Sequence, residues 1–589
     1  MSYKINRLRE KMNANGLEAF FISGSDPHQS EYLASHWNIR SWLTGFTGSA
    51  GVAIVTKEHA GLWTDSRYYI QAESELKDTE WTMHKMDSNA IPSYIRWVQE
   101  HLHKGSVIGM DGRTLSHSQY GQFDKWLKPY HIALQIYSDL ISEIWEDRPE
   151  IPENPIFEHV IKFAGKSRQE KLEQVRKKME ELNVNSYLLT ALDDIAWTFN
   201  LRGSDVECNP VFLSYACINR EEAILFVNEK KLDPELIDSL KKDNIKIANY
   251  SDIMDFLNQL PENEKVLMDP TQVNAVLWKS VNGIKESGQS IVKWEKSIKN
   301  DVELKHFRHT MAKDGAALAE AFHWLDQNIE KLKITEFDLA MKIAECRSRK
   351  AHYYGESFHA IVGYRSNGAI VHYRPLPEQC AILESSGLLL VDSGGQYLDG
   401  TTDITRTFTM GEVSADEKLH YTLVLKGMLA LSSIQFPAGT TGIQLDILAR
   451  QFLWSHGLDY GHGTGHGIGF FLNVHEPPQG FAHTLSERGK STIKPGMVTS
   501  NEPGYYKVGH YGIRIENLIH SIDAGNGFLK FETLTLYPYD TSLIDASMLS
   551  QNEISTINAY HTYVFDHVSP FIEDPETVAW FKEKCAQIL

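Results

Sequence analysis

Cysteine is scarce in this sequence. Only five cysteines occur among 589 residues, and no two of them form a Cys-x-x-Cys pair. The five are Cys208, Cys217, Cys346, Cys380 and Cys585. An odd number of scattered cysteines is typical of free thiols in a reducing compartment. The sequence therefore indicates neither a disulfide framework nor a thiolate zinc site.

Long apolar runs are absent as well. No run approaches the roughly 18 to 20 residues that a membrane-spanning helix needs. The opening segment, MSYKINRLREKMNANG, is charged and amphipathic. A secretory signal would instead have a basic stub followed by an apolar core. We therefore expect a cytoplasmic protein without a membrane partner.

Positive charge is in deficit. The chain has 58 lysines and arginines against 77 aspartates and glutamates, which gives a formal net charge of −19. Such a field repels phosphate backbones, so we do not expect a nucleic-acid partner. Low-complexity tracts are also missing, and a hydrophobic share of 42% is typical of a folded globular protein.

The chain is too long for a single hydrophobic core, and its length predicts two to four domains. Two helix-like stretches, residues 7–13 and 171–182, each run into an apolar segment, AFFIS and SYLLT, that predicts a strand. The two copies align at a constant offset of 167 residues, which pairs Phe21 with Leu188. We interpret them as two related α/β domains in tandem.

Breaks in the pattern suggest the domain limits. The segment EDRPEIPENPIF has three prolines among acidic residues and cannot continue a helix, so we place a linker near residue 155. A long helix is predicted from Asp301, and a second helix follows Thr335, which forms a predicted capping box with Asp338. The expected ranges are 1–155, 156–299, 300–525 and a C-terminal extension of 526–589.

Acidic residues and histidine gather in strand-like segments of the third range. VDSGGQYLDGTTDITRTF places Asp392 and Asp403 eleven positions apart, on two predicted strands joined by a Gly-rich turn. HGTGHGIG adds His466, NEPGYY adds Glu502 after a strand, and GIRIEN adds Glu516 on the next strand. One imidazole and four carboxylates suit two divalent cations, most favourably manganese, with zinc, cobalt or iron also compatible. The spacing alone supports a two-metal hydrolase.

The ordered set D-x10-D, HGxGHGIG, EPG and RIEN resembles the pita-bread metallopeptidase family, which includes methionine aminopeptidases, prolidases and aminopeptidases P. The segments SDPHQSEY, GFTGSAG, LWTDSRYY, WTFNLRGSDVE and FLNVHE extend the resemblance to the three-domain cytosolic aminopeptidases P over nearly the whole chain. The resemblance implies an α/β (α+β) fold class, with two tandem creatinase-like N-terminal domains followed by a pita-bread catalytic domain.

The same resemblance implies roles for the metal ligands. Asp392 would be the terminal ligand of one metal ion. His466 and Glu502 would complete the other, and Asp403 and Glu516 would bridge both.

Four further residues would complete the site. His372 in IVHYRP, His462 in HGTGHG and His475 in NVHEPP would line the substrate site, where they could hold the tetrahedral oxyanion or the carbonyl on the proline side. Arg514, two positions before Glu516, would orient the bridging carboxylate.

The expected function is hydrolysis of the N-terminal Xaa-Pro bond of peptides through a metal-bridging hydroxide, with Glu502 as proton shuttle as well as ligand. A prolidase, which cleaves Xaa-Pro dipeptides only, has the same ligands and is the nearest alternative. A non-catalytic pita-bread binding protein or a creatine amidinohydrolase is disfavoured, because those relatives lack the metal ligands. Trp454 lies where aminopeptidases P carry a dimer-contact tryptophan, so we expect a homodimer.

Overall fold

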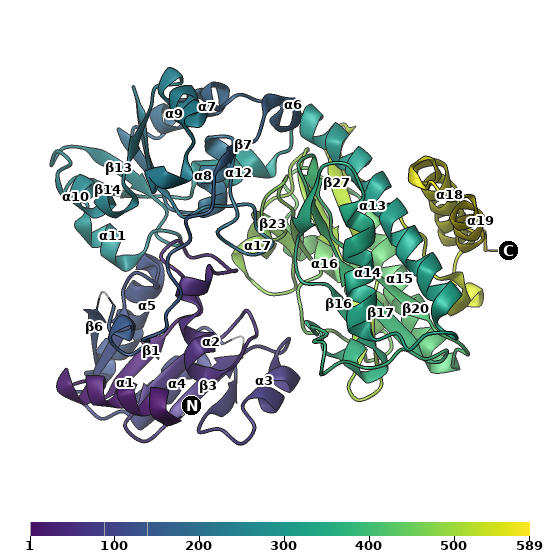
Figure 1. The fold of residues 1–589 in the computed structure, drawn as a ribbon, viewed down its shortest axis with the longest axis horizontal. Coiled ribbons are helices and arrows are strands. Elements are labelled where there is room, and N and C mark those ends of the chain that lie inside the picture. The colour runs from purple at the N-terminus through teal and green to yellow at the C-terminus, as the bar shows by residue number, and fades with distance from the viewer. Residues whose placement is uncertain (1, 88, 138, 589) are drawn as a thin grey trace. The chain divides into compact units, whose positions relative to one another are not determined.

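The computed structural model describes residues 2–87, 89–137 and 139–588. The chain forms two compact units (Figure 1). The first unit consists of Met1–His159 and Lys166–Val292, and the second of Val160–Gly165 and Lys293–Leu589.

The first unit contains two six-stranded sheets. The strands of one are β1 (Ala19–Ile22), β2 (Val52–Thr56), β3 (Ala60–Thr64), β4 (Thr82–Lys85), β5 (Val107–Asp111) and β6 (Ala133–Tyr137). The strands of the other are β8 (Ser186–Leu189), β10 (Tyr215–Asn219), β11 (Ala223–Phe226), β12 (Ile245–Ala248), β13 (Lys265–Met268) and β14 (Ile284–Ser287). Their orders are β4-β3-β2-β1-β5-β6 and β12-β11-β10-β8-β13-β14.

The repeat predicted from the sequence is confirmed by this topology. In each sheet the first strand is antiparallel to the second, in the pairs β1·β2 and β8·β10, and parallel to the fifth, in the pairs β1·β5 and β8·β13. Strand β8 begins and ends 167 residues after β1. Helices α1 (Ser2–Ala14) and α7 (Arg168–Glu181) precede these two strands in the same way. The first unit is therefore one α/β design used twice.

Shorter helices fill the connections of the two sheets. They include α2 (Ile39–Thr44), α3 (Tyr69–Glu75), α4 (Ser93–His101), α5 (His117–Leu127), α8 (Leu192–Thr198), α9 (Pro234–Lys242), α10 (Ile253–Asn258) and α11 (Ala275–Ser280). The loop that follows β1 joins the two halves, because the ring of His28 is hydrogen-bonded to the Thr190 carbonyl and to the Tyr250 hydroxyl, both at 2.8 Å.

The second unit is built on antiparallel sheets. Its largest sheet has the order β21-β28-β27-β24-β22-β23. These strands are β21 (Gln435–Pro437), β22 (Gly465–Gly467), β23 (Glu476–Phe481), β24 (Val498–Asn501), β27 (Asn517–Gly525) and β28 (Phe528–Thr533). A three-stranded sheet pairs β16 (Ile361–Tyr364), β17 (Leu388–Ser393) and β20 (Ile404–Thr409). The remaining strands are β15 (Tyr353–Glu356), β18 (Gly395–Tyr397), β19 (Gly400–Thr401), β25 (Gly504–Lys507) and β26 (Tyr511–Arg514).

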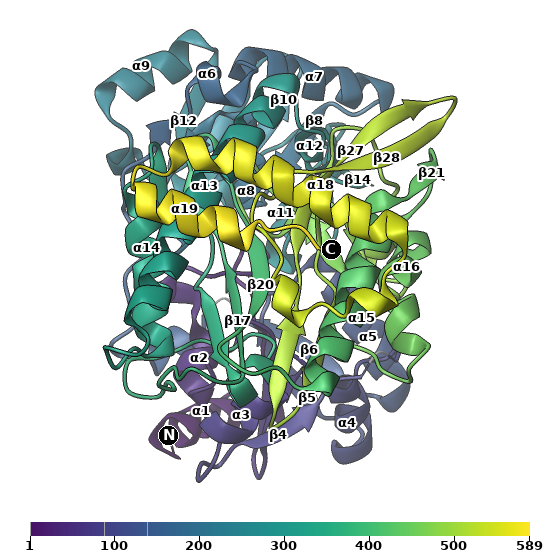
Figure 2. The ribbon, with the colours of Figure 1, turned by 90° about the vertical axis from the view of Figure 1, so that its right-hand side faces the viewer.

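Helices complete the second unit. Among the described residues they are α6 (Ile161–Ala164), α13 (Asp301–Asn328), α14 (Glu336–Ser348), α15 (Ala415–Ser433), α16 (Gly442–Trp454), α17 (Glu487–Lys490), α18 (Gln551–Val568) and α19 (Pro575–Lys584). Helix α12 (Ile291–Ser297) begins in the first unit and ends in the second. The capping box predicted for Thr335 and Asp338 begins α14. Helices α18 and α19 pack against α13 (Figure 2). Phe307, Val391, Val568 and Phe581 belong to one buried cluster, so the last two helices share a core with α13 and β17.

The domain limits expected at residues 299 and 525 can be compared with the two units and with the sheets. Residue 299 lies between α12 and α13, six residues after Lys293, where the long segment of the second unit begins. The second unit also takes in the short segment Val160–Gly165, whose Phe163 belongs to its core. Residue 525 ends β27 at the turn into β28, and the two strands pair in one sheet. The C-terminal extension therefore shares a sheet with the preceding range, and the four ranges stay a proposal.

The sequence predicts neither a membrane-spanning helix nor a disulfide framework. Within the residues that the structure describes, no helix combines the length and the apolar character that a bilayer crossing demands. The five cysteines are not joined by disulfide bonds in the structure.

Candidate metal centre

Two aspartates reach the centre from the three-stranded sheet. Asp392 lies on β17, which pairs with β20 so that Asp392 is opposite Thr405. Asp403 directly precedes β20, and the β18–β19 hairpin lies between the two aspartates. The prediction that each aspartate lies on a strand is therefore wrong for Asp403. The two side chains nevertheless come from neighbouring positions of one antiparallel pair.

His466 and Glu502 come from the largest sheet. His466 lies on β22, and Glu502 follows the last residue of β24. His466 Nε2 is 3.3 Å from Glu502 Oε1 and 3.5 Å from Asp403 Oδ2. Its Nδ1 is 3.0 Å from the carbonyl oxygen of Gly467, which can only accept a hydrogen bond. Nδ1 therefore carries the proton, and the lone pair of Nε2 faces two carboxylates, the orientation of a metal-binding histidine.

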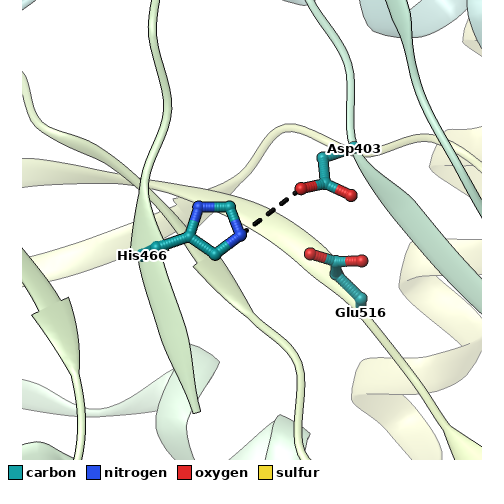
Figure 3. Close-up of side chains that lie close together, drawn as sticks. All are labelled: Asp403, His466 and Glu516. Atoms are coloured by element: carbon teal, nitrogen blue, oxygen red, sulfur yellow. Dashed lines mark ion pairs between the residues drawn. The ribbon is translucent and has the colours of Figure 1, made fainter. Parts of the chain in front are cut away.

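Glu516 closes the group. It lies between β26 and β27, so its predicted place on a strand is also wrong. Its Oε2 accepts a hydrogen bond from the Thr405 hydroxyl at 2.9 Å. One ligand atom from each of Asp403, His466 and Glu516 lies within 4.8 Å of the others, and the three side chains converge (Figure 3).

Burial and crowding of negative charge dominate the electrostatics. Burial, together with the neighbouring carboxylates, raises the pKa of Asp403 and of Glu516 well above the usual range. Burial likewise raises the pKa of Glu502 to about 7. Asp392 Oδ1 and Glu516 Oε1 are buried without a hydrogen-bond partner. Because buried carboxylate oxygens without donors are costly, this donor set fits divalent cations that prefer oxygen ligands.

Arg514 donates to Asp392, and the prediction that it orients a bridging carboxylate is wrong. Its Nη2 and Nε lie 2.6 and 3.2 Å from Asp392 Oδ2. Arg514 ends β26, a strand that contacts β17, whereas the chain leaves the strand before Glu516. The guanidinium therefore points across to β17. Arg514 is only 2% exposed, so this is a buried, charge-assisted contact that fixes the carboxylate of Asp392.

His475 is the second imidazole next to His466. The centroids of the two rings are 4.3 Å apart and their planes are inclined by 71°. The residue after it, Glu476, is buried and pairs with Lys299, and its other oxygen lies 3.5 Å from Lys296 Nζ. These ion pairs fix the start of β23 and hence the backbone that carries His475.

His462 and His372 are both connected to Arg514 through neighbouring groups. His462 Nε2 is 2.8 Å from the Tyr506 hydroxyl oxygen, which accepts a hydrogen bond from Arg514 Nη1 at 2.7 Å. His372 lies in the connection between β16 and β17, directly after Val371, whose carbonyl oxygen is 3.4 Å from Arg514 Nη2. Each of these two histidines is half-buried.

Three hydroxyl groups of the centre were not predicted. Besides Tyr506, the Thr405 hydroxyl lies 3.1 Å from Arg514 Nε. Ser500 Oγ donates to Glu502 Oε1 at 3.1 Å. Thr405 and Ser500 each stand two residues from a carboxylate of the site, the spacing that places side chains on one face of a strand. That spacing is the signal that could have identified them.

Models of known families cover most of the chain. The Creatinase/Prolidase N-terminal domain matches residues 4–140, and a second model of the same description matches residues 147–303. Metallopeptidase family M24 matches residues 305–521, and the C-terminal region of peptidase_M24 matches residues 527–588.

Relatives and solved structures agree with these matches. Aminopeptidase P2 of Arabidopsis thaliana is 38% identical over 96% of this chain and 85% of its own length. Probable Xaa-Pro aminopeptidase P of Tuber melanosporum is 40% identical over 99% of both chains. The crystal structure of X-prolyl aminopeptidase from Caenorhabditis elegans, described as a cytosolic enzyme with a di-nuclear active site, has a TM-score of 0.95 at 33% identity and covers 99% of both chains. An Xaa-Pro dipeptidase from Bacillus anthracis, at 24% identity and a TM-score of 0.50 over 63% of this chain, shows likeness of fold alone. This chain therefore belongs to metallopeptidase family M24, among its Xaa-Pro aminopeptidases, and is a hydrolase.

Proposed function

We propose that this chain hydrolyses the N-terminal Xaa-Pro bond of peptides with two divalent metal ions. Asp392, Asp403, His466, Glu502 and Glu516 would hold the ions. The observation that carries the proposal is that Asp403, His466 and Glu516 converge, with Glu502 3.3 Å from His466, while Asp392 Oδ1 and Glu516 Oε1 are buried without a hydrogen-bond donor. The oxygen-rich ligand set favours manganese, with zinc and cobalt as alternatives.

The position of each ligand suggests how the ions would be shared. Asp403 Oδ2 lies 3.5 Å from His466 Nε2, and ligand atoms of Asp403 and Glu516 lie within 4.8 Å of each other, so Asp403 would suit a bridging carboxylate and Glu516 would be the second bridge. His466 and Glu502, 3.3 Å apart, would complete one ion. Asp392 would be the terminal ligand of the other ion, with Arg514 holding its second oxygen in place.

Bound divalent ions supply Lewis acidity, which makes a water molecule nucleophilic near neutral pH and polarises the scissile carbonyl. Glu502 is our candidate for moving the proton. Burial raises the pKa of Glu502 to about 7, and a carboxyl group whose pKa lies near the working pH is suited to accept and release a proton. The hydrogen bond from Ser500 holds Oε1 in one orientation. Glu502 would accept a proton from the attacking water and deliver it to the prolyl nitrogen that leaves.

Histidines would bind the peptide around this centre. His475 adjoins His466, and His462 is linked to Arg514 through Tyr506. His372, His462 and His475 would donate hydrogen bonds to the peptide carbonyl oxygens and to the oxyanion. The crowded carboxylates would attract the α-ammonium group of the substrate, which accounts for removal of the terminal residue only. Because an Xaa-Pro amide has no N–H, the pyrrolidine ring would be recognised by shape.

Prolidase is the alternative activity, and chain coverage disfavours it. The relatives that align over nearly the whole chain are named aminopeptidase P. The Bacillus anthracis dipeptidase covers only 63% of this chain, although 99% of that protein is matched. The additional N-terminal domain is therefore a feature shared with the aminopeptidases P.

We also propose that the enzyme is a cytoplasmic homodimer. Trp454 and Ile447, seven residues apart on α16, are 43% and 50% exposed, so an apolar stripe of this helix faces solvent. The related Caenorhabditis elegans enzyme is described as cytosolic, and five cysteines that form no disulfide suit the same compartment. Sedimentation equilibrium tests the dimer.

The function is tested by product release from the tripeptide Arg-Pro-Pro beside the dipeptide Ala-Pro. The metal-stripped protein, the manganese-restored protein, Glu502→Gln and the exposed control Glu487→Gln would be compared. We expect manganese-dependent release of arginine that is lost in Glu502→Gln and kept in the control. Cleavage of the dipeptide alone would make the enzyme a prolidase. Cleavage of neither substrate would refute the proposed activity.

A further inference from the structure

A buried carboxylate outside the metal centre organises one loop of the second unit. Glu336 is the first residue of α14 and is fully buried. It accepts hydrogen bonds from four residues that all follow β15 in the chain. The donors are the Tyr364 backbone N–H at 2.7 Å, the Asn367 side-chain amide at 3.0 and 3.1 Å, the Tyr373 hydroxyl at 2.7 Å and the Ala381 backbone N–H at 2.7 Å.

These donors surround the connection that carries His372. The connection between β16 and β17 spans residues 365–387, and its regular structure is one 3-10 turn, Arg365–Ala369. Irregular segments receive little support from backbone ladders, so side-chain contacts must determine their position. The Tyr373 hydroxyl, one residue after His372, is one of the groups that Glu336 holds.

The connection also contacts β26. A Cβ atom on Gly512 would lie only 1.7 Å from the carbonyl oxygen of Gly368, so the two backbones are in direct contact. Two residues farther along β26, Arg514 donates to the Val371 carbonyl at 3.4 Å. The connection is therefore held both by Glu336 and by the arginine of the proposed metal centre.

Stabilisation of its own helix does not explain Glu336. A glutamate in the first turn of a helix usually stabilises that helix, because its negative charge interacts favourably with the unpaired backbone N–H groups of the turn. In α14 the capping box satisfies the backbone N–H groups of Thr335 and Asp338, and the Glu336 N–H donates to the Ala381 carbonyl. The hydrogen bonds that the Glu336 carboxylate accepts come instead from the end of β16 and from the connection.

We infer that Glu336 is a positioning residue for hydrolysis, and that it acts by presenting His372 to the peptide. This inference rests on the proposed function. The carboxylate matches four converging donors, and hydrogen bonds to a charged acceptor are stronger than those to a neutral one. A glutamine at this position would place its NH2 group where a carboxylate oxygen now accepts hydrogen bonds. The donors that point at that oxygen would then be buried without an acceptor.

The test compares Glu336→Gln with three other variants. Glu336→Asp keeps the charge and should recover part of the activity. Tyr373→Phe removes only one of the donors to Glu336, and it replaces Glu336→Gln in the test if that variant does not fold. Glu345→Gln is the matched control, because Glu345 lies on the same helix with its side chain 54% exposed.

We expect Glu336→Gln to lower kcat/KM for Arg-Pro-Pro by about tenfold or more, with manganese affinity unchanged and Glu345→Gln like the wild type. In a His372→Ala background the same change should cost less than about twofold, because residues that act through one another are not additive. Wild-type activity in Glu336→Gln, or an equal loss with and without His372, would overturn the inference.

Hydrogen exchange separates this inference from the proposed function. If the wild-type enzyme does not cleave Arg-Pro-Pro, the proposed function fails. Faster exchange of residues 365–381 in Glu336→Gln than in Glu345→Gln would still support the positioning of the loop. Equal exchange in these two variants would contradict it.

Discussion

Loading of the proposed metal centre should release protons, so manganese should bind more tightly as the pH rises. In the metal-free chain the pKa of Asp403 and of Glu516 lies well above the usual range, and that of Glu502 is about 7, because these groups are buried together. Metal ligands must be deprotonated to bind. A cation that enters the site near neutrality must therefore displace protons from this group.

The size of the effect follows from the number of protons displaced. Each one lowers the apparent association constant about tenfold for every unit by which the pH falls. The three carboxyl groups of raised pKa share their protons, so we expect between about one and about three to leave near pH 7. Going from about pH 7 to about pH 6 should then weaken manganese binding by roughly 10- to 1000-fold.

Isothermal titration calorimetry in two buffers of different ionisation enthalpy counts the released protons directly. Glu502→Gln, which removes one of the titrating groups, should release fewer protons than the wild type. Glu487→Gln should behave as the wild type. Manganese binding that releases no protons and does not vary between about pH 6 and about pH 8 would show that these carboxyl groups are already ionised, and would refute the argument from burial.

Three further outcomes can be checked. Arg514→Lys should weaken manganese binding by about 10- to 100-fold, because lysine cannot hold Asp392 through two nitrogens, and unchanged affinity in the titration would contradict this. Gly512→Ala should lower kcat/KM by about tenfold or more, since its Cβ would collide with Gly368, and wild-type kinetics would contradict the close approach. Burial lowers the pKa of His561 to about 4, so the ring is neutral in the folded chain and protonated in the unfolded chain below about pH 6.5. Its stabilisation is complete above about pH 6.5 and declines by about 3 kcal/mol as the pH falls to about 4, so urea unfolding of His561→Gln should depend less steeply on pH, and parallel curves would contradict the assignment.

The architecture of the first unit could be predicted because its signals are local. A helix followed by a short apolar strand recurs at a fixed offset, and β1 and β8 lie at that offset in the structure. The limit expected at residue 525 stays a prediction, and β27 pairs with β28 across the turn there. Composition changes there, but the sheet continues.

The site could be predicted as a set of residues but not as a set of contacts. Which carboxylate Arg514 meets depends on how β26 lies beside β17, which spacing along one strand does not determine. Asp403 and Glu516 stand just outside strands, where the chain bends to bring carboxylates together. Glu336 gave no signal, because an acidic residue after a capping threonine is ordinary at the start of a helix. Its four donors become visible only in three dimensions.

The shared core of the second unit affects the order in which the two units can fold during translation. Val568 and Phe581 complete the same apolar cluster that contains Phe307 and Val391, the neighbour of Asp392. The strands that carry the carboxylates are thus translated long before the helices that seal the core behind them. The two repeats of the first unit can fold on the ribosome one after the other, as domains generally do. We therefore expect the second unit to complete its core, and with it the proposed metal centre, only after α19 has been synthesised.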